Sequence, residues 1–142
     1  MLFIFKSRYT MIGYMLTGDQ LNRDDLSRTT TSTTLKTSID ALCQSDRNEH
    51  IRGYNSFGTI FERHGLGTAY PSLTNPKPGT RTFFSGGHII RNYCSKINAI
   101  QAELPFDIRT GNNKRTNAQQ FAHVIIEYMT INNLLVAKEN KM

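Results

Sequence analysis

The segment Ile97–Leu104 (INAIQAEL) restricts the possible folds of this chain more than any other part of the sequence. Successive side chains of a β-strand point to opposite faces, so Ile100, Ala102 and Leu104 would share one face. The other face would then carry Ala99, Gln101 and Glu103. The pattern predicts a half-buried strand, and Pro105 ends it because proline cannot donate a backbone hydrogen bond to a neighbouring strand.

Thr116–Ile131 shows the period of an amphipathic helix instead. We expect Thr116 or Asn117 to cap its N-terminus, because both side chains accept hydrogen bonds from the first-turn amides. Val124 lies at the edge of the predicted apolar face. That face consists of Ala118, Phe121, Ala122, Ile125, Tyr128 and Met129.

Two shorter segments also have helical spacing. Leu35–Gln44 (LKTSIDALCQ) places hydrophobic residues on one side of a short helix. Asn55–His64 (NSFGTIFERH) predicts a second helix, which begins at a cap formed by Asn55 or Ser56 and stops at Gly65.

Tyr9–Leu16 (YTMIGYML) is a short apolar and aromatic run that predicts a second strand, followed by a turn. The polar range 21–34 and the proline-containing range 68–82 predict surface loops, and the range 134–142 predicts a frayed tail. Strands alternating with helices predict one α/β domain over residues 1–142. The visible strands are too few for a complete doubly wound sheet.

The sequence argues against two classes of partner, nucleic acid and a membrane. The formal net charge is +6, but the Lys and Arg residues are scattered, and the tightest pair is Lys114-Arg115. Nucleic-acid binding is therefore not expected, because it needs a basic patch or stripe. The apolar start, Met1–Phe5, is too short for a secretory signal or a membrane span. With only Cys43 and Cys94, we expect thiols in a reducing, cytoplasmic environment.

Common catalytic motifs do not appear in the sequence. Its four histidines do not form an HExxH motif, and Ser85 does not lie in a G-x-S-x-G elbow. Glu103 remains as the carboxylate best placed for proton transfer, because its strand neighbours are apolar. The alternative is that it faces water on an edge strand, or pairs with Arg91 or Arg109.

Six segments in a fixed order carry a resemblance to a known family. They are GYMLTGDQLN, KTSIDAL, YNSFGTIFERHG, AYPSLTNPKPG, FFSGGHIIRNY and INAIQAELPFDIR. Together they resemble the C-terminal part of the N-formylglutamate amidohydrolase-like family, over roughly Ile12 to Tyr128. The most specific part is a combination of two features. One is a Gly-Gly turn followed by an arginine, and the other is an Ile-Gln-x-Glu-Leu-Pro strand.

The resemblance implies a zinc-dependent amide hydrolase that acts on a small acidic amide. Its fold would be a three-layer α/β/α domain related to zinc carboxypeptidases. Glu103 would stand at the position of the catalytic acid and base, and Arg91 at that of a substrate-carboxylate ligand. Gly86 and Gly87 would bring a loop close to the substrate.

This chain departs from the family at two places. His88 stands where the family usually has an aromatic residue. The family's zinc ligands precede the strand matched by Tyr9–Leu16, so we expect no metal ligands in this chain and little activity from it alone. The chain would then be a C-terminal fragment of such a hydrolase. The alternative is a non-enzymatic remnant, or an α/β module that binds a partner.

Overall fold

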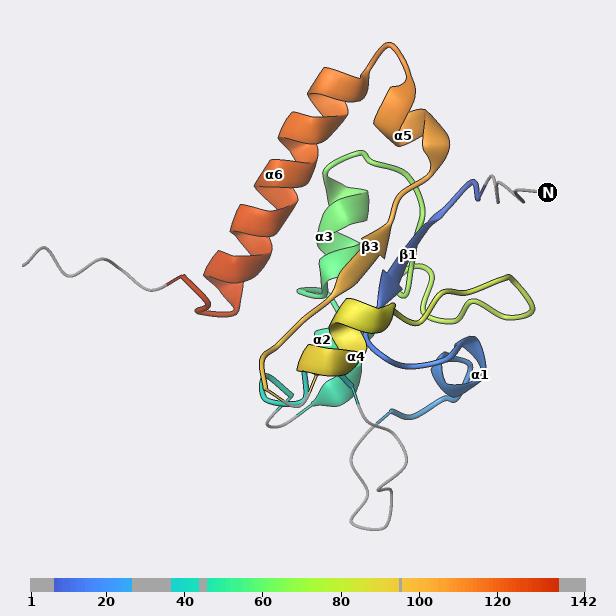
Figure 1. Cartoon of the computed structure of the whole chain (residues 1–142), viewed down its shortest axis with the longest axis vertical. Coiled ribbons are helices and arrows are strands. Elements are labelled where there is room, and N and C mark those ends of the chain that lie inside the picture. The colour runs from blue at the N-terminus through green and yellow to red at the C-terminus, as the bar shows by residue number, and fades with distance from the viewer. Residues whose placement is uncertain (1–6, 27–36, 44–45, 95, 136–142) are drawn as a thin grey trace, which may run out of the picture.

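A computed structural model describes residues 7–26, 37–43, 46–94 and 96–135 of the chain. Within these ranges the protein belongs to the α/β class, with a small mixed sheet and several helices (Figure 1). The general class expected from the sequence is therefore confirmed.

The sheet has three strands in the order β2-β1-β3: β1 (Thr10–Gly13), β2 (Ala69–Tyr70) and β3 (Gln101–Glu103). The central strand β1 runs parallel to β2, pairing Met11 with Tyr70, and antiparallel to β3, pairing Met11 with Glu103. Two of these strands lie inside the segments predicted to be strands, although both are shorter than predicted.

β2 was missed, because it lies inside the predicted loop 68–82. Two residues are too few to show any alternation. Their strand geometry depends on tertiary contacts instead: Thr10 N–H donates to the Thr68 carbonyl, and Ala69 N–H donates to Glu62 Oε1 at 2.9 Å.

Helix α3 (Phe57–Arg63) confirms the helix predicted over Asn55–His64. Its N-cap is Ser56, whose hydroxyl accepts a hydrogen bond from Thr59 N–H. The helix ends before Gly65, which has a φ of +73°, a conformation that favours glycine.

Helix α6 (Lys114–Ile131) begins before both predicted caps, and its N-cap Asn113 makes no side-chain capping hydrogen bond. Its packed face is also rotated from the prediction, since Val124 and Tyr128 are buried whereas Ala118 and Ala122 are exposed. The rotation follows from packing on α3, where the Phe57 ring meets the Tyr128 ring edge to face at 5.3 Å.

The helix predicted over Leu35–Gln44 is wrong for its described part, residues 37–43, which form a turn. Two neighbouring segments hold this turn. Ser38 N–H donates to the Tyr14 carbonyl at 2.9 Å, and the Ser38 hydroxyl donates to the Ala99 carbonyl. Backbone and hydroxyl groups bound in this way are not available to extend a helix. The rest of that prediction lies outside the described residues.

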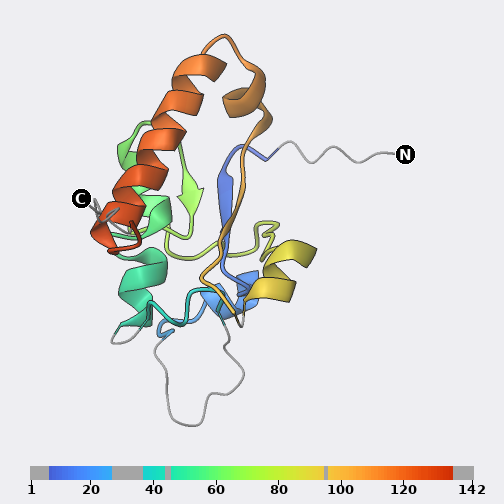
Figure 2. The same ribbon diagram turned by 60° about the vertical axis from the view of Figure 1, so that its left-hand side comes forward.

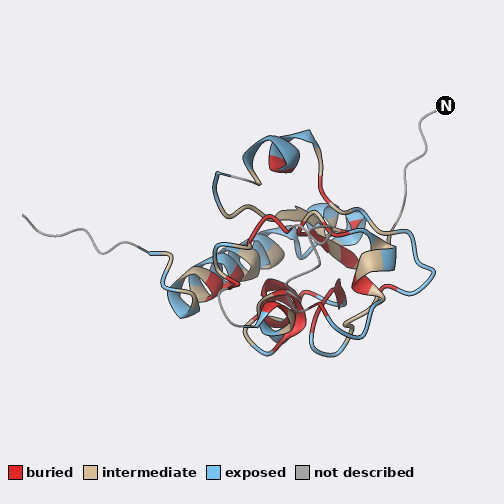
Figure 3. Ribbon diagram, turned by 90° about the horizontal axis from the view of Figure 1, so that it is seen from below, coloured by how far each residue is buried: buried red, intermediate tan, exposed pale blue. Residues whose placement is uncertain are grey.

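Four short helices complete the described part of the fold: α1 (Gly18–Leu21), α2 (Arg47–Arg52), α4 (His88–Tyr93) and α5 (Phe106–Thr110). Figure 2 shows α3 and α6 on one side of β1 and β3, and α4 on the other. Buried residues concentrate along β1, β2 and α3, whereas β3 is partly buried, and α5 and much of α6 are exposed (Figure 3).

Candidate functional site

Glu103 lines a cleft of about 760 Å³. The walls come from the residues that enter β1, the segment before α4, the end of β3, and α5. They carry one carboxylate, two guanidinium groups and three aromatic rings. The lining residues are Ser7, Arg8, Tyr9, Met11, Thr82, Phe83, Phe84, Glu103, Leu104 and Arg109.

Strand β3 places Glu103 in this cleft by its alternation. Ile100, Ala102 and Leu104 pack against the hydrophobic core, as the sequence predicted. Glu103 therefore leaves the strand on the opposite face, where it is half-buried beside Met11 of β1.

Gln101 connects Glu103 to the Gly-Gly turn. Its amide Nε2 donates a hydrogen bond to Glu103 Oε1 at 2.8 Å, and its Oε1 accepts one from Gly87 N–H at 2.9 Å. Gln101 and Glu103 are two positions apart on one strand, so their side chains share a face. The turn and the carboxylate are thus held in a fixed relation by one side chain.

The Gly-Gly turn approaches other backbone closely. A Cβ atom on Gly13 of β1 would lie 2.8 Å from the backbone carbonyl of Ser85, so only glycine fits there. Gly86 has a φ of +128°, and a Cβ on Gly87 would lie 3.1 Å from Gln101 Oε1. Gly86 and Gly87, to which the resemblance assigns a substrate-binding role, therefore serve the packing of this turn.

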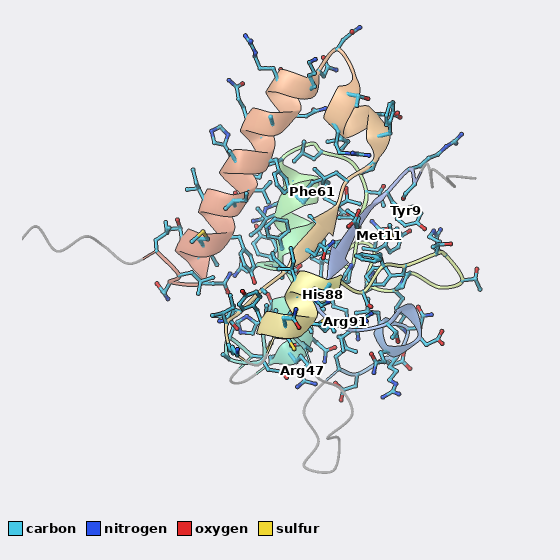
Figure 4. All side chains as sticks on the ribbon, in the orientation of Figure 1. Tyr9, Met11, Arg47, Phe61, His88 and Arg91 are labelled. Carbon is cyan, nitrogen blue, oxygen red and sulfur yellow. The ribbon has the colours of Figure 1, made fainter. Side chains whose placement is uncertain are left out.

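Arg91 lies elsewhere. It is exposed on α4, together with His88, whose Nε2 contacts Asn92 Nδ2 at 2.9 Å. Figure 4 places both on α4, and Tyr9 and Met11 at the start of β1. The structure therefore brings Glu103 and Gly87 together through Gln101, but Arg91 is not among the residues that line the cleft.

The cleft has two arginines of its own, Arg8 and Arg109, which sequence reasoning did not assign to substrate. Arg109 extends over the Phe106 ring, with its guanidinium carbon 6.0 Å from the ring centre. Within the described ranges, neither guanidinium forms an ion pair, and Glu103 pairs with neither Arg91 nor Arg109. With Glu103 ionised, the described lining of the cleft has one more positive than negative group.

A second polar cluster joins α3 to α6. His64 Nε2 contacts Glu127 Oε2 at 2.5 Å, and Arg63 donates to Glu127 Oε1 at 2.7 Å. The hydrogen bond from His64, followed by that from Arg63, lowers the pKa of Glu127. His123 lies near, its ring centre 6.3 Å from that of His64. Even so, the described residues contain no group of three His, Cys, Asp or Glu side chains that could hold a metal ion.

An apolar groove of about 550 Å³ runs between β3 and α6. Ile39, Ile100, Phe121 and Ile125 are among its walls, and none of the described residues that line it is charged. Tyr128 also lines it, and burial followed by the charge of Cys43 raises the pKa of Tyr128 to about 12. Its hydroxyl therefore stays protonated near neutral pH.

Comparisons of the chain with protein-family models, with curated proteins and with solved structures give no match. Across the described ranges, no helix has both the length and the apolar character needed to cross a membrane.

Proposed function

We propose that this chain forms the substrate-binding and proton-transferring part of a hydrolase that cleaves small acidic amides. The resemblance to the N-formylglutamate amidohydrolase-like family supports the reaction class. One observation supports the site: Glu103 lines a cleft that also carries Arg8 and Arg109. The three-layer α/β/α fold belongs to the same proposal, and the helices on both sides of the sheet support it (Figure 2).

Glu103 is the proposed proton carrier. Gln101 donates a hydrogen bond to Glu103 Oε1, while Glu103 Oε2 has no hydrogen-bond partner within the described ranges. The carboxylate can take a proton from a water that attacks the amide carbonyl and then give it to the leaving nitrogen. Such general acid–base help is worth about 10²–10⁴ in rate.

Binding of the substrate carboxylate has two competing assignments. The resemblance implies Arg91, whereas the cleft itself presents Arg8 and Arg109. A guanidinium group binds a carboxylate through two parallel hydrogen bonds, so either arrangement is chemically suitable. We propose Arg109 as the principal contact, because α5 carries it to the cleft that contains Glu103. Arg109→Gln should weaken binding of N-formyl-L-glutamate, and Arg91→Gln should not; the reverse result would favour Arg91.

The resemblance also implies zinc, which would polarise the scissile carbonyl and activate a water. No set of ligands for it exists among the described residues. We therefore expect the chain by itself to turn over slowly.

Formate release from N-formyl-L-glutamate, followed by NMR with and without added zinc chloride, tests the hydrolase proposal. We expect slow release by the native chain, and release at least about 10²-fold slower by Glu103→Gln. Equal rates in the two chains, including no release by either, would contradict it.

A partner-binding module is the second candidate, and the groove between β3 and α6 favours it. Ile125 lines this groove and is 38% exposed. If two copies associate through the groove, Ile125→Glu should convert dimers to monomers in sedimentation velocity. Ile89→Glu is the matched control, because Ile89 is exposed on α4, away from the groove. A native chain that is monomeric at all concentrations would remove this form of the candidate.

A further inference from the structure

Half of the described residues that line the Glu103 cleft are apolar. The formyl group of a small acidic amide would leave these residues without a contact. The apolar lining residues are Tyr9, Met11, Phe83, Phe84 and Leu104. Sites for small molecules have such walls, with a few polar groups that fix the orientation of the ligand. The ligand chemistry can therefore be inferred from both sets of groups.

The aromatic walls are held in place by the surrounding structure. The Tyr9 hydroxyl donates to the Thr82 carbonyl at 2.6 Å, and the Tyr9 ring meets the Tyr70 ring edge to face at 5.3 Å. Phe84 is 39% exposed, and its backbone N–H lies 3.2 Å from Met11 Sδ. Phe84 thus offers an aromatic surface to the cleft that the protein itself does not cover.

The polar groups define the rest of the ligand. Arg8 and Arg109 give the cleft two guanidinium groups without ion pairs in the described chain, against the single carboxylate of Glu103. A ligand with one carboxylate would balance this excess of positive charge. A flat apolar group on the same ligand would cover Phe84.

We infer that the cleft selects N-aroyl amino acids, which are acidic amides whose acyl group is an aromatic ring. The amide part of this inference rests on the proposed function. The ring would contact Phe84, the carboxylate would bind a guanidinium group, and the amide would lie between them beside Glu103. Selection is by apolar contact and by charge together, so both parts of the ligand are needed.

Three related compounds separate these contributions in a titration followed by NMR. Hippurate has the ring and the carboxylate, N-acetylglycine lacks the ring, and hippuramide lacks the charge. We expect hippurate to bind about tenfold more tightly than N-acetylglycine, because the ring buries apolar surface. We expect it to bind about fivefold more tightly than hippuramide, with the difference shrinking at high salt.

Two matched variants locate the selection. Phe84→Leu should reduce the preference for hippurate over N-acetylglycine to about twofold, because a leucine offers no flat ring. Tyr93→Leu, at an exposed aromatic residue on α4, should leave it unchanged. Arg109→Gln should weaken the binding of hippurate without weakening the binding of hippuramide. Chemical-shift dispersion of each variant establishes that it is folded.

Equal binding of hippurate and N-acetylglycine, or no saturable binding of hippurate, would overturn the inference. An unchanged preference in folded Phe84→Leu would also overturn it. The hydrolase proposal fails separately: selective binding of hippurate without any hydrolysis would support the cleft inference and contradict the enzyme. Hydrolysis of N-formyl-L-glutamate without a preference for aromatic ligands would support the enzyme and contradict the cleft inference.

Discussion

Between α3 and α6, aromatic and charged side chains contact one another, whereas in the Glu103 cleft Phe84 is partly exposed and the two arginines form no ion pair in the described part of the chain. Phe61 is fully buried and meets the Phe121 ring at 6.1 Å, while Phe84 is 39% exposed. Arg63 pairs with Glu127, while Arg109 has no ion pair in the described part of the chain. The first region uses these groups to hold two helices together. In the second they are available to a ligand.

The largest expected effect comes from truncating Phe61, with Phe84 as its comparison. Phe61→Ala should lower the free energy of unfolding by about 3–5 kcal/mol, because it leaves a cavity in the core. Phe84→Ala should lower it by less than about 1 kcal/mol, since its ring is only partly covered. Urea unfolding of both variants gives the two values. Similar losses would mean that the Phe84 ring has a structural role equal to that of Phe61.

Gln101→Leu comes next in size. It removes the acceptor for Gly87 N–H and the donor to Glu103, each worth about 1 kcal/mol net. Amide hydrogen exchange should show lower protection of Gly87, whereas the amide of Thr59 at the start of α3 should be unaffected. Unchanged protection of Gly87 would mean that the turn does not depend on Gln101.

The elements that sequence predicted best depend on local patterns. Alternation gave the face of β3 that carries Glu103, and the Ser56 cap with Gly65 gave the limits of α3. The prediction failed where tertiary contacts decide the structure. Ser38 is bound to neighbouring segments instead of starting a helical turn, and the buried face of α6 is set by the rings of α3.

The cleft could be predicted only in part, for the same reason. Glu103 was found because its strand has a readable pattern. Arg8 and Arg109 were not assigned to substrate, because they lie far apart in the sequence and line one cleft only when β3 pairs with β1. Arg91 stood closer in sequence to the Gly-Gly turn, but nearness in sequence did not place it in the cleft.

The contact between Glu127 and His64 should have a smaller effect, which depends on pH. Because the pKa of Glu127 is lowered in the folded chain, its contribution is complete above pH 4.5 and disappears as the pH falls through the lowered pKa. The side chain is 35% exposed, so solvent screening keeps the contribution below about 1 kcal/mol. Native chain and Glu127→Gln should therefore differ in urea unfolding at pH 7, and the difference should shrink as the pH falls through the lowered pKa of Glu127. A constant difference across this range would exclude the linkage.

Glu103→Gln should have the smallest effect on stability, and this sharpens the contrast between the two regions. A glutamine at this position keeps an Oε1 that can still accept the hydrogen bond from Gln101. Its Oε2 has no partner to lose among the described residues, so the free energy of unfolding should change by less than about 0.5 kcal/mol. Glu127→Gln at pH 7 serves as the matched comparison, because there the carboxylate contacts both Arg63 and His64. A large loss in Glu103→Gln would assign Glu103 to the framework of the fold, and the cleft would then lack its proposed proton carrier.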